Sequence, residues 1–354
     1  MKKRVTLAMI IVLVTVVPAI VIMLPVTYFA TGQIQMAALW ASIPAIAGLA
    51  TTVNGGQRFG MLAAIVMGFL APLTIVAGLS PVSGAALMAL LAMLVGRLSR
   101  FGLHKSALLV PVMMAWPLID PPLWAGQTTV DRTDEAYLLW MAAIFFVGGL
   151  FPALVIPILA RKRQRPQLTS HTREEVVPYT VIITVLVTAS TFYVLSNARM
   201  YGGAFLIAAI LVLAPMGTAN SLRPTLLRIL GTLIGSFLIL ILVAQVHSLV
   251  AIYLFGVVFI VIALIARFGR YGWLYYVFMM PATASLNATT LTQFSQLGEQ
   301  RLVDNVVGGL LVLIAAAAAI AYSGWSTKHG RAREDDPETE GLLNVREPVA
   351  TKAA

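Results

Sequence analysis

The stretch Arg228-Ile-Leu-Gly231-Thr-Leu-Ile-Gly235 decides the fold, because it belongs to a segment whose landmarks occur twice in the chain. Arginine is scarce here, yet several Arg, a Gly and a Pro recur at a constant spacing of 170 residues. The matched pairs are Arg58 with Arg228, Arg97 with Arg267, Arg100 with Arg270, Gly102 with Gly272 and Pro111 with Pro281. This spacing predicts an internally duplicated protein, with each half one copy of a helical bundle.

Composition places the chain in a membrane. Of its 354 residues, 59% are hydrophobic and 11% are charged, whereas a soluble domain has about 25% charged residues. Apolar runs long enough to cross the hydrocarbon layer as helices recur along most of the chain. The net charge of +10 comes from basic residues scattered between these runs. They are typical of topology determinants, so we expect membrane lipid around the protein and no nucleic-acid partner.

The apolar runs predict an all-α polytopic protein of about twelve transmembrane helices, arranged as two parallel six-helix repeats. The helices are expected at residues 6–28, 34–53, 59–79, 82–97, 103–119 and 137–160, then 176–196, 202–221, 225–246, 248–266, 271–287 and 302–324. The first helix follows Lys2-Lys3-Arg4 and is too long for a cleaved signal peptide.

These helices divide the chain into four parts. We expect a first transmembrane repeat at 1–160, a basic cytoplasmic linker at 161–175, a second repeat at 176–325 and a disordered cytoplasmic tail at 326–354. With a cytoplasmic N-terminus, all but three of the 24 Lys and Arg residues fall on the cytoplasmic side. Because this bias sets orientation, both termini are predicted to be cytoplasmic.

Two arginines at the expected cytoplasmic ends of helices, Arg58 and Arg228, are candidate substrate-binding residues. Guanidinium groups can collect a planar anion by bidentate contact, although an Arg at a helix end is also an ordinary snorkelling anchor. The small-xxx-small spacing of Gly231 and Gly235 is more typical of close helix packing than of substrate binding.

Prolines interrupt two helices at corresponding positions, Pro111 and Pro117 in one and Pro281 in the other. Interrupted helices in matching halves point to a transporter binding site, although a packing kink is the alternative. Nearby polar and aromatic side chains complete the predicted substrate site, namely Trp116, Tyr275, Tyr276, Thr283, Ser285 and Asn287.

Two Arg–carboxylate pairs are candidates for proton coupling. Arg132 precedes Glu135 by three residues and Arg301 precedes Asp304 by three, which places each pair on one helical face. Asp304 is the best candidate, because a carboxylate inside the apolar layer tends to mark a pathway. The alternative is an acid at a helix N-terminus that interacts with the helix dipole.

Other chemistry is not expected. The chain has no Cys, and His104 and His247 are lone, so neither a metal site nor a cofactor is predicted. An intramembrane enzyme would need convergent His, Asp or Glu clusters, and the sequence has none.

Paired halves with Arg228-Ile-Leu-Gly-Thr-Leu-Ile-Gly and, later, Arg301-Leu-Val-Asp-Asn-Val-Val-Gly resemble the fusaric acid resistance and aromatic acid exporter superfamily, in a compact branch without a large cytoplasmic domain. The first half matches weakly, because Arg58-Phe-Gly lacks the Arg-x-x-Gly-Thr form. The resemblance implies a bacterial inner-membrane efflux component, proton-coupled, exporting aromatic or other organic acids with a periplasmic membrane-fusion adaptor.

Two functions follow from these observations. The first is a proton-coupled exporter of small amphipathic, aromatic or anionic compounds, and the second is a non-transporting membrane scaffold of an envelope complex. Substrate identity, transport direction and a homo-oligomeric state stay open.

Overall fold

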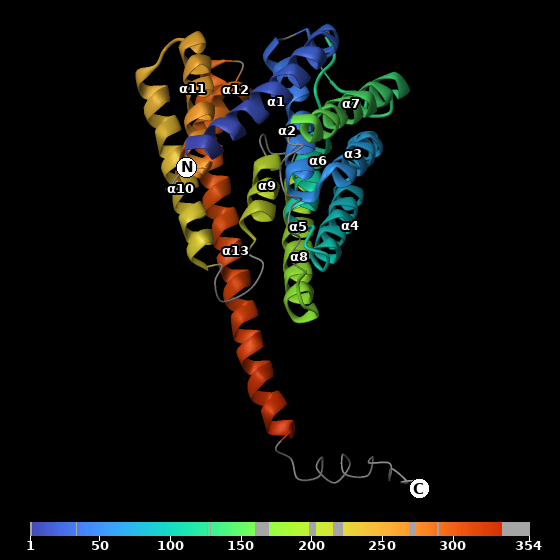
Figure 1. The fold of residues 1–354 in the computed structure, drawn as a ribbon, viewed down its shortest axis with the longest axis vertical. Coiled ribbons are helices and arrows are strands. Elements are labelled where there is room, and N and C mark those ends of the chain that lie inside the picture. Colours follow the sequence, from blue (N-terminus) through green and yellow to red (C-terminus); the bar gives the residue numbers. More distant parts are fainter. Residues whose placement is uncertain are drawn as a thin grey trace.

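The computed structural model describes residues 2–32, 34–125, 127, 129–159, 170–197, 203–214, 222–268, 273–288 and 290–334. Every regular element in this part of the chain is a helix (Figure 1). The first half contains α1 (Lys2–Thr31), α2 (Ile34–Gly55), α3 (Gln57–Ala77), α4 (Pro81–Ser99), α5 (His104–Ala107), α6 (Leu109–Ile119) and α7 (Glu135–Leu159). The second half contains α8 (Arg173–Ser196), α9 (Gly203–Leu213), α10 (Leu222–Gln245), α11 (Leu249–Phe268), α12 (Leu274–Asn287) and α13 (Leu291–Glu334).

Most predicted helices lie within a few residues of their expected bounds, and two differ. The helix expected at 103–119 is divided into α5 and α6, with a turn at Leu108. The last helix begins at Leu291 instead of 302, because Phe294 and Leu297 are buried against α10 and α12 and extend the helix through a polar sequence. It also continues to Glu334, so residues 326–334 are helical and not a disordered tail, while 335–354 lie outside the described residues.

The linker and the helix at 202–221 lie partly outside the described residues. Residues 160–169 and 215–221 are not described, and residues 173–175 of the expected linker belong to α8. Gly203–Leu213 is helical, as expected.

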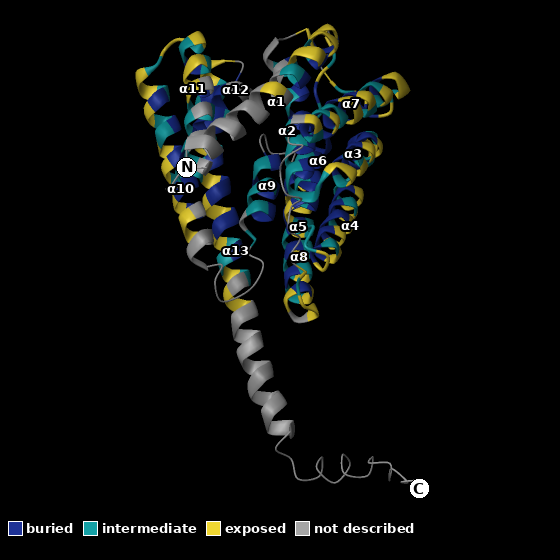
Figure 2. Cartoon of the chain, viewed as in Figure 1, coloured by how far each residue is buried: buried dark blue, intermediate teal, exposed yellow. Residues whose placement is uncertain are grey.

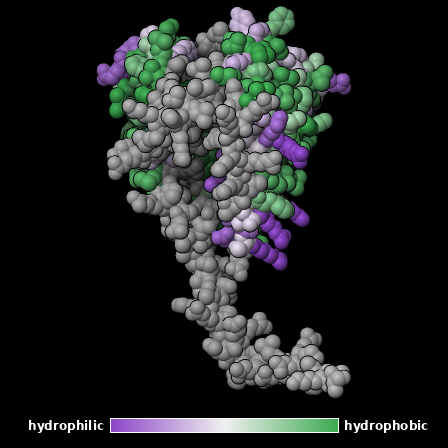
Figure 3. Space-filling view, in the orientation of Figure 1, coloured by the Kyte–Doolittle hydropathy of each residue, from purple (hydrophilic) through white to green (hydrophobic). Residues whose placement is uncertain are grey.

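Four helices in the described part of the chain are long and apolar enough to cross a membrane, at Gln57–Ala77, Pro81–Ser99, Glu135–Ile158 and Glu175–Ser196. Less than half of each of these spans is buried (Figure 2), and large apolar residues such as Leu73, Leu90 and Val181 are exposed. Hydrophobic residues cover much of the described surface, and hydrophilic ones gather toward the lower ends of α4 and α8 (Figure 3). An apolar surface of this extent is covered by lipid, so the protein is a multi-pass membrane protein.

In helix α3, the buried face and the exposed face differ in the size of their side chains. Its buried face is made largely of small residues, namely Gly60, Ala63, Ala64, Gly68 and Ala71. Its exposed face carries large apolar residues, namely Leu62, Ile65, Phe69, Leu73 and Val76. In lipid, burial from water does not drive helices together, so small residues mark the packed face and large apolar ones face the acyl chains.

The helices of each half contact one another, and a further group of contacts, which we call the seam, joins the two halves. In the first half α7 packs on α2 and α3, and in the second half α13 packs on α9 and α10. The halves meet where α6 contacts α9, α2 contacts α12, α4 contacts α8 and α1 contacts α11. Helices α10 to α13 enclose a smaller core of their own, which includes Ile239, Ile252 and Phe294.

The glycines of α10 lie where α12 comes closest. A Cβ on Gly235 would collide with the carbonyl oxygen of Val277 and would lie 2.8 Å from Met280 Cβ, and one on Gly231 would lie 3.0 Å from Tyr276 Cβ. The prediction that these glycines serve packing is therefore confirmed.

Replacing Gly235 by Ala should lower the free energy of unfolding by about 1–3 kcal/mol, because the methyl group forces apart two backbones in contact. Gly309→Ala is the matched control, since the nearest atoms to a Cβ there belong to the Ile229 side chain, at an ordinary 3.4 Å. Thermal unfolding of both purified variants, followed by tryptophan fluorescence, measures the difference. Equal stability of the two variants would show that the α10–α12 contact is looser than described.

Candidate functional site

Helix α13 carries a stripe of buried charged, polar and small residues. Its buried positions recur at helical spacing and are Arg301, Asp304, Asn305, Gly308, Gly309 and Val312. The opposite face is apolar and exposed, with Val303, Val306, Val307, Leu310 and Ile314. The helix therefore turns its charged and small residues inward and its large apolar residues toward lipid, and ionisable residues inside a membrane protein are expensive and functional.

Arg301 lies at the centre of the stripe, only 2% exposed. Its Nη1 donates to Thr283 Oγ1 and to the backbone oxygen of Met280, the latter at 3.3 Å. The guanidinium carbon lies 3.6 Å above the ring of Phe205 on α9. A cation over an aromatic face keeps a favourable electrostatic contact after it has lost water. Arg301 is thus held between α9 and α12.

Asp304 and Asn305 follow one turn later on the same face. Asp304 is 5% exposed, and its Oδ2 accepts no hydrogen bond from the described residues. Asn305 donates from Nδ2 to the backbone oxygen of Arg301 at 2.7 Å. An ionised carboxylate away from water is costly unless a nearby charge or donor compensates it. The neighbouring guanidinium is such a charge, so the two side chains form one electrostatic unit.

The seam between the halves supplies the aromatic wall of this site. Trp116 of α6 meets the edge of Phe205 with ring centroids 5.0 Å apart. The contacts therefore run from Trp116 through Phe205 to Arg301 and Thr283, across α6, α9, α13 and α12. We call Trp116, Phe205, Thr283, Arg301 and Asp304 the seam cluster.

Other predicted substrate residues lie elsewhere. Arg58 is exposed at the start of α3, and Tyr275 and Tyr276 stack edge to face at 5.2 Å near the start of α12, two turns before Thr283. Ser285 is fully buried and faces Gly256 of α11. The side chains of Arg228 and Asn287 lie outside the described residues.

The prediction that Arg132 and Glu135 lie on one helical face is wrong, because Arg132 precedes α7 and only Glu135 belongs to it. Glu135 is exposed, whereas Arg132 is 4% exposed and donates to the backbone oxygens of Leu118 at 2.8 Å, Ile119 at 3.1 Å and Ile75 at 3.2 Å. These carbonyls end α6 and α3, where a cation interacts favourably with the helix dipoles. Arg132 is therefore a helix-capping residue that joins two helices of the first half.

The structure also contradicts the alternative interpretation of Asp304, in which it is an acid at the N-terminus of a helix. Helix α13 begins thirteen positions earlier, at Leu291, so Asp304 lies well inside the helix. The helix dipole acts within the first turn and cannot account for this carboxylate. The acid that does cap a helix is Asp134, whose Oδ1 accepts from the backbone N–H of Ala136 at 3.0 Å, in the first turn of α7.

Sequence reasoning missed Phe205 and Asn305 as members of this site. The inward stripe of α13 could have identified Asn305, because it lies beside Asp304 in an Arg-x-x-Asp-Asn-x-x-Gly-Gly pattern. No local signal marks Phe205, which is one aromatic residue in an apolar helix.

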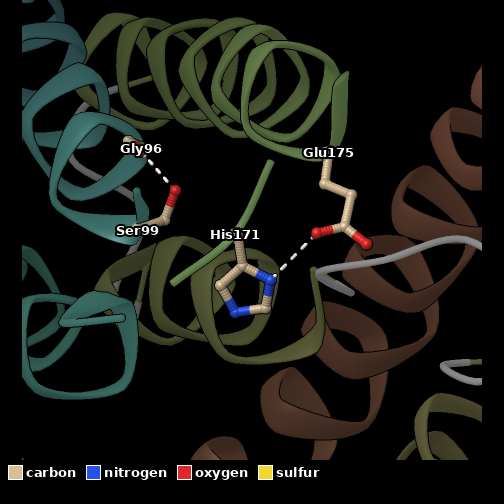
Figure 4. Close-up of polar contacts among 4 residues, drawn as sticks. All are labelled: Gly96, Ser99, His171 and Glu175. Atoms are coloured by element: carbon tan, nitrogen blue, oxygen red, sulfur yellow. Dashed lines mark hydrogen bonds and ion pairs between the residues drawn. The ribbon is translucent and has the colours of Figure 1, made fainter. Parts of the chain in front are cut away.

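A second polar group lies where α8 begins. His171 Nδ1 is 3.1 Å from Glu175 Oε2, and the Ser99 hydroxyl at the end of α4 donates to the backbone oxygen of Gly96 (Figure 4). The His104 ring lies 5.1 Å from that of His171. The interpretation of His104 as a lone histidine is therefore wrong. No group of three potential ligands for a metal ion occurs within the described ranges.

The pH dependence of stability should report on His104. Burial, then the charges of His171 and Lys105, lowers the pKa of His104 from 6.5 to about 4. Between these values the unfolded chain binds more protons than the folded protein, so stability should fall as pH falls through this window. We expect the thermal midpoint of the protein to drop more from pH 7 to pH 4.5 than that of His104→Gln. Parallel curves would contradict this burial of the imidazole.

Comparison with known proteins identifies the second half. The family model described as fusaric acid resistance protein-like matches residues 187–315, a little over a third of the chain. The matched segment runs from within α8 into α13 and contains both quoted motifs and most of the seam cluster. No curated protein and no solved structure matches the chain. Residues 187–315 of this chain are therefore similar to the fusaric acid resistance protein-like family, as the motifs of the second half predicted.

Proposed function

We propose that this protein is a bacterial inner-membrane efflux transporter that exports small amphipathic organic compounds, aromatic or anionic, in a proton-coupled reaction. The observation that carries the proposal is the buried pair Arg301 and Asp304 on α13, which borders the contact between α6 and α9 through the ring of Phe205. Burying two ionisable side chains there costs free energy, and ionisable residues inside a membrane protein commonly mark a substrate or proton pathway. The family match over residues 187–315 is consistent with membrane transport.

The substrate class follows from the chemistry of the seam cluster. Arg301 offers a planar guanidinium that binds carboxylates in a bidentate manner. Phe205 and Trp116 add aromatic faces on which a flat ring can stack. An aromatic carboxylate would satisfy both parts, with its charge at Arg301 and its ring toward the aromatic wall.

We further propose that the fold consists of two parallel six-helix repeats with both termini in the cytoplasm. A match that supports this lies at residues 147–150 and 307–310, which both read Val-Gly-Gly-Leu. In α7 these glycines face Pro44 of α2 and Ala64 of α3, at 2.7 and 3.2 Å from an added Cβ. In α13 they face helices α9 and α10, the counterparts of α2 and α3, at 3.3 and 3.4 Å. Equivalent glycines thus pack on equivalent helices.

The same alignment shows that the two halves differ in the polarity of the buried residues at matching positions. Aligned through the paired glycines, the positions of Arg301, Asp304 and Asn305 correspond to residues 141, 144 and 145. Those residues are Met, Ile and Phe, all buried, and Phe145 stacks edge to face on Trp40 of α2 at 6.4 Å. One half therefore holds an apolar packing layer where the other holds the polar site, which supports one coupling site per chain.

The coupling step is assigned to Asp304. When its carboxylate is ionised, the negative charge one turn from Arg301 competes with any anionic substrate. Protonation removes that competition, so the guanidinium attracts the substrate more strongly. Proton and anion binding are then linked through a single electrostatic unit.

Outside the bilayer, we propose that a periplasmic adaptor of the membrane-fusion type receives the substrate. No enzymatic activity is proposed, and a non-transporting scaffold is the function that the following experiment would reveal instead.

The direct test is efflux of a panel of aromatic carboxylates from cells that express the protein, with an Arg301→Gln variant of equal membrane abundance. We expect Arg301→Gln to lower efflux at least tenfold, because the loss of a charged hydrogen-bonding partner costs about 1.5–3 kcal/mol. Absence of efflux of every compound by the wild-type protein, confirmed in the membrane, would favour the scaffold.

Asp304→Asn should uncouple transport from the pH gradient while leaving the protein folded. The amide is permanently neutral, so substrate binding should persist while its dependence on pH is lost. Glu299→Gln is the matched control, because Glu299 lies on the same helix and is exposed. Substrate flux measured in proteoliposomes with and without a pH gradient distinguishes them, and an Asp304→Asn protein that still responds to the gradient would show a structural role for Asp304.

A further inference from the structure

Four basic side chains lie at one end of the contact between α4 and α8. Arg97 and Arg100 lie at the end of α4, Lys105 belongs to α5, and Arg173 begins α8. All four residues are exposed, and hydrophilic side chains gather at this end of the two helices (Figure 3). We call these four residues the basic end.

Two contacts show which parts of α4 and α8 lie side by side. A Cβ on Gly96 would collide with the Thr180 side chain, and the ring centroids of His104 and His171 lie 5.1 Å apart. From the first contact to the second, the residue number rises in the first half of the chain and falls in the second half. The two helices therefore run antiparallel, and the end of α4 lies beside the start of α8.

This arrangement brings an arginine from each half of the chain to the same end. Arg100 lies between the two contacts, and Arg173 lies two positions after the second one. Because each residue adds about 1.5 Å along a helix, the two arginines lie within about one turn of the same level. One ligand bound at this end therefore contacts both halves.

The positive charge of the basic end is not neutralised by carboxylates in the described part of the chain. The nearby Glu175 carboxylate lies 3.1 Å from His171 Nδ1 instead (Figure 4), and the side chain of Glu174 lies outside the described residues. No ion pair joins a described carboxylate to any of the four basic residues. Like charges held close together repel one another, and an anion from outside removes that repulsion.

Rows of lipid-facing residues lead directly to the basic end. On α8, Arg173 continues a row of exposed valines at intervals of four residues, namely Val177, Val181 and Val185. On α4, Arg97 continues a row of exposed apolar residues, namely Leu90, Met93 and Leu94. An arginine at the end of such a row extends its charged group to the level of the lipid headgroups. A lipid whose acyl chains cover these rows brings its phosphate to the basic end.

We propose that the basic end binds the headgroup of an anionic membrane phospholipid, whose acyl chains lie along the exposed rows of α4 and α8. Arg100 and Arg173 share the phosphate oxygens, because guanidinium groups bind phosphate through paired hydrogen bonds. Arg97 and Lys105 add positive charge, which favours an anionic headgroup over a zwitterionic one that carries its own cation. The bound lipid joins the first half of the chain to the second. This site is separate from the proposed transport function and does not depend on it.

A soluble anion is a poorer occupant than a lipid. A free phosphate ion gains charge contacts alone, and salt weakens such contacts at an exposed site. A phospholipid adds the contact of its acyl chains with the rows on α4 and α8, and the bilayer keeps it against this surface.

Native mass spectrometry of the full-length protein, released from detergent micelles that contain equal amounts of a phosphatidylglycerol and a phosphatidylcholine, tests the proposal. We expect the wild-type protein to retain the phosphatidylglycerol in preference. Arg100→Gln and Arg173→Gln should each lower that preference about fivefold, because one basic residue near anionic lipid contributes about 1 kcal/mol. The double variant should show no preference.

Arg58→Gln is the matched control, because it removes the same charge from an exposed position at the start of α3, outside the basic end. It should keep the preference of the wild-type protein. An equal loss in Arg58→Gln would overturn the proposal, since it would show a general attraction between basic protein and anionic lipid.

A second measurement distinguishes a loss of binding from a loss of folding. Added phosphatidylglycerol should raise the thermal midpoint of the wild-type protein and of Arg58→Gln more than phosphatidylcholine does. In the double variant the two lipids should have equal effects. A double variant that keeps the wild-type preference would overturn the proposal. Displacement of the lipid by millimolar inorganic phosphate would also overturn it, and would assign the basic end to a soluble anion.

Discussion

The burial of one guanidinium group governs the second half of this protein. Arg301 is 2% exposed in a helix whose other face is covered by lipid, so its charge must be compensated by protein. The compensation comes from the oxygens of α12 and the ring of Phe205, and the Asp304 carboxylate lies one turn away on the same face of α13. The positions of α9 and α12 relative to α13 are fixed by these contacts. A change at any of them alters the electrostatics of the whole seam cluster.

In the first half, α7 packs on its neighbouring helices without buried charged residues of its own among the described residues. Its α7 approaches α2 and α3 through Gly148 and Gly149, and apolar residues occupy the positions that correspond to the polar stripe of α13. Its buried guanidinium, Arg132, is used differently, because it caps the ends of α3 and α6 through three carbonyl oxygens. The two halves thus use closely packed glycines on α7 and α13 alike, while only α13 carries the buried Arg301 and Asp304. The part of the chain that carries this polar site is also the part that the family model matches.

Hydropathy predicted most helices because an apolar run in a membrane has little alternative to helix. It missed the start of α13, since residues 291–300 are largely polar and pack on the other helices through Phe294, Leu297 and Gly298. Sequence spacing correctly grouped Arg301 with Asp304, whose separation is fixed by the helix itself. It did not group Arg132 with its carbonyl partners, nor Trp116 with Phe205, because those contacts depend on how distant helices pack. The same limit explains why Tyr275 and Ser285, close in sequence to Thr283, face other neighbours.

The central claim is that Asp304 and Arg301 link proton binding to substrate binding, and proton exchange on binding tests it most directly. Purified protein in weakly buffered solution would be mixed with an exported aromatic carboxylate while a dye reports pH. If protonation of Asp304 frees Arg301 for the anion, substrate binding takes up a proton, and the solution becomes more alkaline with the wild-type protein but not with Asp304→Asn. Binding that exchanges no proton, or an equal pH change with the variant, would contradict the account.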